Sequence, residues 1–285
     1  MEPRFSVLVP VYEQWDLVPQ LLARLTAQSL AQDEFEVILA DNGSPHFAPP
    51  AILPANTRIV TCTDPGSYAA RNVAASAAKG RWFAFTDADC LPEPGWLTGL
   101  AAAAGDARTI LVGAVDVRPM SETLNAYEIY DMIGGIPQER YAGRGYGATA
   151  NLAVSADLFA ATGGFDGARL SGGDAEFCRR AAAQGAGVKF VPAARVVHPA
   201  RNNWDAIATK SRRVLGGQIA AGPLLRRAAY VLRAFASPAL PAWRFARAPY
   251  PARFRLLAMG VQLRLWGVEV AEAARLLAGR PAERR

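Results

Sequence analysis

The sequence predicts an α/β fold, with a mostly parallel sheet flanked by helices and a helical, basic extension at the C-terminus. Over roughly the first hundred residues, short apolar runs alternate with helical patterns, as in a doubly wound parallel sheet with right-handed crossovers. The charge is uneven, because residues 201–285 hold 16 Arg and Lys against 4 Asp and Glu in a chain of net charge +6. We therefore expect a main domain over residues 1–200 and a separate helical region over residues 201–285.

The composition limits the class of protein. A chain of 285 residues with 51% apolar residues can bury one sizeable core. Its three cysteines have unrelated spacings that predict neither disulfides nor a zinc site, which favours a reducing cytoplasm. The N-terminal residues lack a signal-peptide pattern, and no apolar stretch reaches the roughly 18 residues of a membrane span. We expect a cytoplasmic protein, and the basic extension leaves peripheral contact with the inner membrane face open.

Four apolar runs in the first part of the chain predict buried strands, each ending in polar residues. Helical patterns follow the first run, where Asp16 is a good N-cap, and the third. The expected strands are 5–12, 35–40, 57–62 and 82–85, and the expected helices begin near 17 and at 67.

The later elements follow from the same periodicities. A strand over 110–117 precedes a helix over 122–133, and the glycine-rich segment 143–151 lets the backbone bend or approach a ligand. A helix starts near 171, and a strand covers 187–192. Beyond residue 200 we expect helices over 204–216, 223–235 and 252–279, with a proline-broken link over 237–251.

Asp87 and Asp89 follow the buried run 82–85, and a turn must come next because of the prolines after them. The aspartates therefore lie at the carboxyl end of a strand, where open α/β sheets bind ligands. Two carboxylates at i and i+2 can converge on Mg²⁺ or Mn²⁺, which prefer oxygen ligands and substrate phosphates. The alternative is a solvated turn whose acids cap the helix starting near Pro94.

Other polar residues at the predicted strand ends are also candidates for ligand binding. Asp41 could accept hydrogen bonds from a base or ribose, and Arg71 and Asn72 could contact a base or phosphate. The alternative for Asp41 is a plain turn. No G-x-G-x-x-G or Walker A sequence occurs, so ordinary dinucleotide and P-loop sites are disfavoured. Asp174 and Glu176 begin a predicted helix, where the simplest interpretation is that their charges complement the helix dipole. The simplest interpretation of His198 is a histidine packed at the end of a strand.

Taken together, eight segments resemble the inverting glycosyltransferases of family 2, which have the GT-A fold. They occur in the family's order and span about two thirds of the chain: VLVPVYE, ADNGS, GSYAARNVAASAAKG, FTDADC, GATAN, TGGFD, GGDAEFCRR and VVHP. The resemblance implies a metal-dependent transferase that moves a sugar from a nucleotide sugar to an acceptor hydroxyl, and we expect the donor to be a UDP-sugar.

The resemblance also implies roles for individual residues. The nucleotide pocket would be lined by Pro10, Tyr12 and Glu13, and the base would be recognised by Asp41 and Arg71. Asp89 would ligate the divalent cation, with His198 completing the metal site and Asp87 nearer the ribose and sugar. Asp174 would be the catalytic base that takes the acceptor's proton. Mg²⁺ and Mn²⁺ cannot be distinguished by an oxygen-rich site.

One departure from the family pattern concerns the acceptor. The family often has Glu-Asp where this chain has Gly173-Asp174, so the base is retained but a neighbouring contact is lost. Asn151, Gly173 and Glu176 are the remaining candidates for acceptor or supporting contacts. The expected acceptor is a lipid, a lipid-linked glycan or a polysaccharide. The alternatives are an inactive nucleotide-sugar-binding protein of the same fold and a sugar nucleotidyltransferase, although the latter's glycine- and lysine-bearing phosphate loop is absent near the first strand.

The C-terminal region mixes arginines with aromatic residues. Such a segment can lie in a membrane interface, with arginines on anionic headgroups and rings at the acyl boundary. No recognised nucleic-acid module is present, so nucleic acid is not an expected partner. The alternative is that these helices only cover the sheet and the acceptor cleft, with solvated arginines outside.

Overall fold

The computed structural model describes residues 2–221 and 223–282, which form two compact units. The first unit contains the chain up to Asp116, Ile136–Ala168 and Gly173–His198. The second contains Val117–Gly135, Arg169–Gly172 and the chain from Pro199 onward. The second unit thus takes two segments from before residue 200 in addition to the C-terminal region.

The first unit is built on a sheet that has eight strands within the described residues, in the order β3-β2-β1-β4-β7-β6-β8-β5. The strands are β1 Phe5–Val11, β2 Phe35–Asp41, β3 Thr57–Thr61, β4 Trp82–Phe85, β5 Leu91–Pro92, β6 Thr109–Arg118, β7 Leu152–Ser155 and β8 Gly187–Pro199. The pairs β3–β2, β2–β1 and β1–β4 are parallel, as predicted. The pairs β4–β7, β6–β7 and β5–β8 are antiparallel, so the α/β class is confirmed with a mixed sheet.

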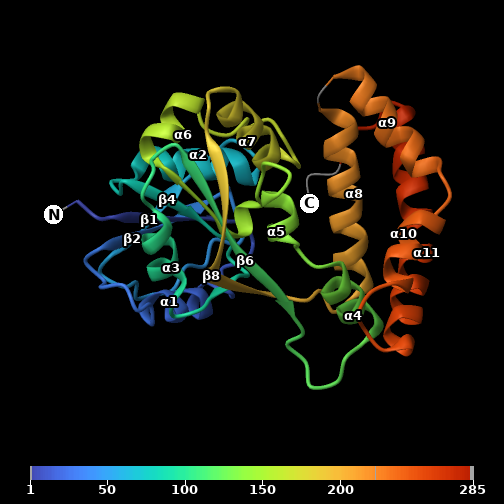
Figure 1. Cartoon of the computed structure of the whole chain (residues 1–285), viewed down its shortest axis with the longest axis horizontal. Coiled ribbons are helices and arrows are strands. Elements are labelled where there is room, and N and C mark those ends of the chain that lie inside the picture. Colours follow the sequence, from blue (N-terminus) through green and yellow to red (C-terminus); the bar gives the residue numbers. More distant parts are fainter. Residues whose placement is uncertain (1, 222, 283–285) are drawn as a thin grey trace. The chain divides into compact units, whose positions relative to one another are not determined.

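Helices cover both faces of this sheet (Figure 1). One core packs around α1 Val18–Thr26 and α3 Trp96–Ala103, and the other around α2 Ser67–Ala77, α6 Ala156–Thr162 and α7 Gly173–Ala183. Val7 and Val9 of β1 enter the first core, whereas Leu8 enters the second. Both faces of β1 are therefore buried, which explains why the strand is apolar except for Ser6, whose hydroxyl is hydrogen-bonded to Glu36. The remaining helices of this unit are α5 Gln138–Ala142 and the 3₁₀ helix Thr149–Asn151.

Two helix starts differ from the prediction. The N-cap of α1 is Leu17, with no side-chain capping bond, so the prediction that Asp16 caps this helix was wrong. Helix α4 is Ala126–Gly134 and begins four residues later than expected. Asn125 fixes that start through a capping box with Glu128, in which each side chain accepts a hydrogen bond from the other residue's backbone N–H.

The second unit is helical. It contains α4, α8 Trp204–Ala220, α9 Leu224–Phe235, α10 Ala239–Ala246 and α11 Ala252–Leu277. Helix α10 lies in the segment predicted to be a link. Helix α11 contacts the other four, and Val261 and Leu265 of α11 form a core with Ile207 of α8. None of the helices in the described parts of the chain has the length and hydropathy that a membrane span requires.

Candidate active site

Asp87 and Asp89 lie directly after β4, all four residues of which are buried. The backbone N–H of Cys90 donates to the carbonyl of Asp87 at 3.0 Å, and the chain then enters β5. Because β5 pairs with β8 in a register that sets Leu91 opposite Val197, His198 comes beside Asp89. The Nε2 atom of His198 lies 3.6 Å from Oδ2 of Asp89. The fold thus joins two predicted metal ligands that are distant in sequence.

The donor atoms at this strand end fit a divalent cation. Ligand atoms of Asp87, Asp89 and Cys90 all lie within 4.8 Å of one another. Within the described structure, Oδ1 of Asp89 is buried without a hydrogen-bond partner, and a bound cation would satisfy it. Burial raises the pKa of the Cys90 thiol well above its ordinary value. A protonated thiol is a poor ligand for Mg²⁺ or Mn²⁺, so the carboxylates, with His198 beside them, are the residues suited to hold the metal.

Arg71 lies on α2 with only 3% of its side chain exposed, and its guanidinium forms an ion pair with Asp87. The ring of Tyr68, one turn earlier on α2, lies 5.6 Å from Cζ of Arg71. The Nε atom of Arg71 is buried and has no partner among the described atoms, which leaves one donor for a ligand. The structure therefore places Arg71 at the D-x-D motif, and its predicted contact with a base stays a prediction.

Asp174 lies in the first turn of α7, where its Oδ1 accepts the backbone N–H of Ala175 at 2.8 Å. Burial raises the pKa of this carboxyl above its ordinary value, and the charge of Asp87 adds to the rise. The bond from Ala175, the guanidinium of Arg71 and the backbone of Thr149 act in the opposite direction. A carboxylate whose pKa is raised is a stronger base, which suits proton abstraction.

Tyr68 also explains the glycine before Asp174. A Cβ atom added at Gly173 would lie 2.7 Å from Cε2 of the Tyr68 ring, so the ring fills the space that a larger side chain would need. Burial raises the pKa of the Tyr68 phenol, as does the neighbouring charge of Asp174. Tyr68 is not among the site residues that the sequence predicted. The available signal was its position three residues before Arg71, on the same side of one helix.

The predicted nucleotide-binding residues lie at the carboxyl ends of β1 and β2. Pro10 is buried within β1, and Val11 pairs with Asp41 in the parallel register. The Asp41 carboxylate accepts the Nε1–H of Trp15 at 3.2 Å and the backbone N–H groups of Gly43 and Ser44 at 3.1 and 3.2 Å. The Asp41 carboxylate therefore stabilises its own turn, the residue is only 4% exposed, and its predicted contact with a nucleotide stays a prediction.

Tyr12 and Glu13 continue the chain beyond β1. Glu13 has a positive φ of 56°, and its backbone N–H donates to Oγ of Ser44 at 3.0 Å. Its carboxylate also accepts the backbone N–H of His46 and lies 2.7 Å from that ring's Nδ1. This hydrogen bond raises the pKa of His46. The loops after β1 and β2 are thus linked, and His46, which had no expected role, supplies part of the link.

Three further candidates have structural contacts. Asn151 is fully buried, accepts the Nε1–H of Trp96 at 2.8 Å, and donates to the carbonyls of Ala114 and Ala194 at 2.8 and 2.9 Å. These bonds hold β6 and β8 together and place Asn151 inside the sheet. Glu176 forms an i,i+4 ion pair with Arg180 on α7. Asn72 binds the backbone N–H and C=O of Phe165.

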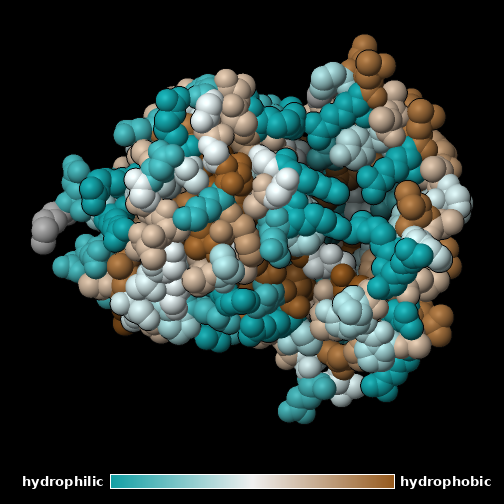
Figure 2. Space-filling view, in the orientation of Figure 1, coloured by the Kyte–Doolittle hydropathy of each residue, from teal (hydrophilic) through white to brown (hydrophobic). Residues whose placement is uncertain are grey.

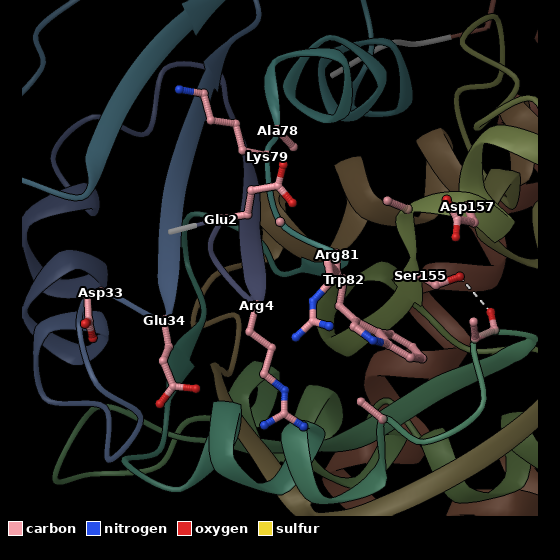
Figure 3. A pocket seen from close by; sticks show the side chains of 14 residues that line it. Glu2, Arg4, Asp33, Glu34, Ala78, Lys79, Arg81, Trp82, Ser155 and Asp157 are labelled. Carbon is pink, nitrogen blue, oxygen red and sulfur yellow. Dashed lines mark hydrogen bonds between the residues drawn. The ribbon is translucent and has the colours of Figure 1, made fainter.

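A cavity of about 750 Å³ lies at the opposite edge of the sheet. Arg4, at the start of β1, and Arg81 and Trp82, at the start of β4, line it together with Ser155 (Figure 3). The parallel strands β1 and β4 begin at this edge, whereas open α/β sheets bind ligands where such strands end. The cavity is therefore separate from the strand-end residues described above.

Comparisons with known proteins agree with this architecture. Residues 6–156 match the family described as glycosyl transferase family 2. The glycosyltransferase AglE of Haloferax volcanii is 30% identical over 226 residues, which cover 76% of this chain and 73% of AglE.

Solved structures show the same fold. A mannosyltransferase from Pyrobaculum calidifontis, in complex with GDP-Man and Mn²⁺, has a TM-score of 0.59 at 21% identity, covering 98% of this chain and 88% of that one. S. aureus TarS residues 1–349, in complex with UDP-GlcNAc, has a TM-score of 0.53 at 15% identity, covering 92% and 72%. Together with the sequence matches, they show that this chain belongs to glycosyl transferase family 2 and is a glycosyltransferase with the GT-A fold.

Proposed function

We propose that this glycosyltransferase is metal-dependent and inverting, and that it moves a sugar from a nucleotide sugar, preferably a UDP-sugar, to an acceptor hydroxyl. The observation that carries the proposal is the grouping of Asp87, Asp89, His198 and Asp174. The first three meet where β4 ends, and Arg71 connects them to Asp174, because it pairs with Asp87 and its charge acts on the Asp174 carboxyl.

The donor would be held at the strand ends. A divalent cation held by Asp89 and His198 would neutralise charge on the departing diphosphate. Asp87 would lie nearer the ribose and sugar, and Arg71 would keep its carboxylate in place. Pro10, Tyr12, Glu13 and Asp41 would line the nucleotide pocket. Two neighbours of the same fold were solved with UDP-GlcNAc and with GDP-Man and Mn²⁺, which supports a nucleotide sugar and a cation here.

Asp174 would act as the general base. Its carboxylate accepts the acceptor's hydroxyl proton as that oxygen bonds to the anomeric carbon and the bond from that carbon to the diphosphate breaks. Attack from the side opposite the diphosphate inverts the anomeric centre. The raised pKa of Asp174 favours this proton transfer, and the fixed carboxylate avoids the reorientation that a mobile base would need.

The acceptor would be a lipid, a lipid-linked glycan or a polysaccharide at the inner face of the cell membrane. Tyr141 of α5 and Tyr146 of the glycine-rich segment stack with ring centroids 4.9 Å apart and offer an aromatic surface for a sugar ring. The catalytic domain would comprise residues 1–200, and the C-terminal helices would cover the acceptor side or contact the membrane.

A transfer assay tests the proposal. Purified protein is incubated with Mn²⁺, lipid-linked acceptors, and UDP-GlcNAc, UDP-glucose or GDP-mannose, and the anomeric configuration of the product is determined by NMR. We expect transfer from a UDP-sugar with inversion, and its loss with EDTA. Transfer with retention, or transfer unaffected by EDTA, would refute the mechanism. Nucleotide-sugar binding without transfer or hydrolysis would favour the inactive binding protein, and formation of a sugar nucleotide from a sugar phosphate would favour the nucleotidyltransferase.

A further inference from the structure

Helix α9 presents three leucines to solvent, while two of its arginines form hydrogen bonds with the neighbouring helix α8. The exposed fractions of Leu224, Leu225 and Leu232 are 78%, 87% and 72%. Arg226 donates to Oε1 of Gln218 at 2.8 Å and Arg227 donates to the carbonyl of Ile219 at 2.6 Å, both within α8. Ala234, Tyr230 and Val231 form the side of α9 that packs on the core, whereas the leucines are a second apolar group outside that side, where a surface helix of a soluble domain is normally polar. The outward leucines of α9 therefore do not serve packing within the second unit.

The same pattern continues on the two neighbouring helices. Helix α10 exposes Leu240 and Trp243, which are three residues apart and share one side of the helix, and α11 exposes Leu256 and Leu257. Helices α9 and α10 both contact α11. Figure 2 shows separate groups of hydrophobic residues over this helical region, with hydrophilic residues between them. We call this set the leucine–arginine surface: Leu224, Leu225, Leu232, Phe235, Leu240, Trp243, Leu256, Leu257 and the arginines around them.

The charge on this surface has one sign. Residues 224–277 contain nine arginines and two glutamates, and neither glutamate is exposed. Glu272 is 2% exposed and bonded to Arg275, while Glu269 is partly buried and accepts the Oγ–H of Ser211 at 3.0 Å. Arg233, Arg244, Arg247 and Arg253 are exposed, and the guanidinium of Arg247 lies 4.2 Å from the ring centroid of Trp243. The surface thus combines apolar side chains with uncompensated positive charge.

We propose that the leucine–arginine surface docks on an anionic lipid bilayer. Leucine side chains and the Trp243 ring would enter the acyl boundary while the arginines bind headgroup phosphates. A second copy of the chain is a worse fit, because a two-fold contact would set arginines against arginines without an exposed carboxylate from these helices to neutralise them. This inference does not depend on the chemistry of the active site, since it rests on the exposed side chains of α9–α11 alone.

Point substitutions are the right test, because removing α9–α11 would also remove Val261 and Leu265 from the core of the second unit. The full-length protein is sedimented with vesicles of phosphatidylcholine containing 30% phosphatidylglycerol, and with pure phosphatidylcholine vesicles. The double variant Leu225→Gln/Leu232→Gln should weaken binding to the anionic vesicles about tenfold or more, since two apolar side chains leave the bilayer. Arg244→Gln/Arg253→Gln should weaken it about tenfold and remove most of its salt dependence.

Ile52→Gln is the matched control, because Ile52 is 87% exposed in the first unit, outside these helices. It should bind vesicles like the unmodified protein. Equal sedimentation of the leucine variant and the control would overturn the proposal. So would equal binding to neutral and anionic vesicles, or light-scattering evidence for a dimer that the leucine variant dissociates. Nucleotide binding, measured in the same variants, should be unchanged, which separates failure of this proposal from failure of the proposed function.

Discussion

The buried guanidinium of Arg71 pairs with the carboxylate of Asp87, and this ion pair connects helix α2 to the end of β4. Asp89, two residues further on, is placed differently, because its Oδ1 is buried without a partner in the described chain. The two aspartates of the D-x-D motif should therefore respond differently to the same substitution.

Asp87→Asn should lower the thermal stability, whereas Asp89→Asn should not. Removing the charge of Asp87 leaves Arg71 buried without its counterion, which we expect to cost about 1–3 kcal/mol after allowance for the partial exposure of Asp87. Asp89→Asn leaves no buried guanidinium without its counterion, because the Asp89 side chain is 26% exposed and its buried Oδ1 has no hydrogen-bond partner within the described chain. Thermal melts in EDTA compare the two proteins. A larger loss of stability in Asp89→Asn would contradict this assignment.

Asp174→Asn should abolish transfer and leave the affinity for nucleoside diphosphate nearly unchanged, because the substitution affects proton transfer and not the diphosphate. Single-turnover assays and calorimetry separate the two quantities. A comparable loss of nucleotide affinity would remove Asp174 from the role of base.

The raised pKa of Asp174 also predicts two pH effects. Transfer requires the ionised carboxylate, so the rate should fall as the pH drops through a value above that of an ordinary aspartate. Because the folded pKa exceeds the unfolded one, ionisation costs stability as the pH rises through this interval. Asp174→Asn should thus raise the melting temperature at neutral pH, and the gain should vanish at pH values below the unfolded pKa. A gain in melting temperature that persists at acidic pH would contradict the assignment of a raised pKa to the buried Asp174 carboxyl.

Gly173→Ala should destabilise the protein by about 1–3 kcal/mol, because the new methyl group would meet the Tyr68 ring. The same substitution in a Tyr68→Leu background should cost less, since the smaller side chain can move aside. A double-mutant cycle of unfolding free energies measures the coupling. Additive effects would show that the Tyr68 ring is not the reason for a glycine at position 173. Gly260→Ala provides the control, because Gly260, like Gly173, is a helical residue without a positive φ, but a Cβ atom added there would meet no atom within 4 Å.

Much of the sheet could be predicted from the sequence because β1, β2 and β4 are buried on both faces, which makes their sequences predominantly apolar. The antiparallel half could not, since the short β5 and β7 depend on partners supplied by distant segments. For the same reason β8 extends through His198, seven residues beyond the predicted strand end at Pro192. Helix α10 was missed because its prolines suggested a break, although Pro238 is its N-cap and Pro241 lies in its first turn.

The candidate site likewise has residues that the sequence could identify and contacts that it could not. The residue types of the D-x-D motif, Asp174 and His198 could be recognised from local sequence and family resemblance. Their partners could not be recognised, because Arg71–Asp87, Tyr68–Gly173 and Trp15–Asp41 are contacts made by tertiary packing. Asn151 is a related case. Its amide is hydrogen-bonded to one donor and two backbone carbonyls of distant segments, which the sequence could not predict, and its role toward the acceptor stays a prediction.

The proposed function depends on a cation that is held by Asp89, with His198 beside it, and that binds the donor's diphosphate. Calorimetric titration of the protein with UDP, GDP, CDP and dTDP, each with Mn²⁺ and with EDTA, tests it most directly, with Asp89→Asn as the matched variant. We predict that UDP binds in Mn²⁺, that EDTA abolishes the binding, and that Asp89→Asn does the same without loss of folding. Binding of UDP that is equally tight in EDTA, or in Asp89→Asn, would contradict the claim.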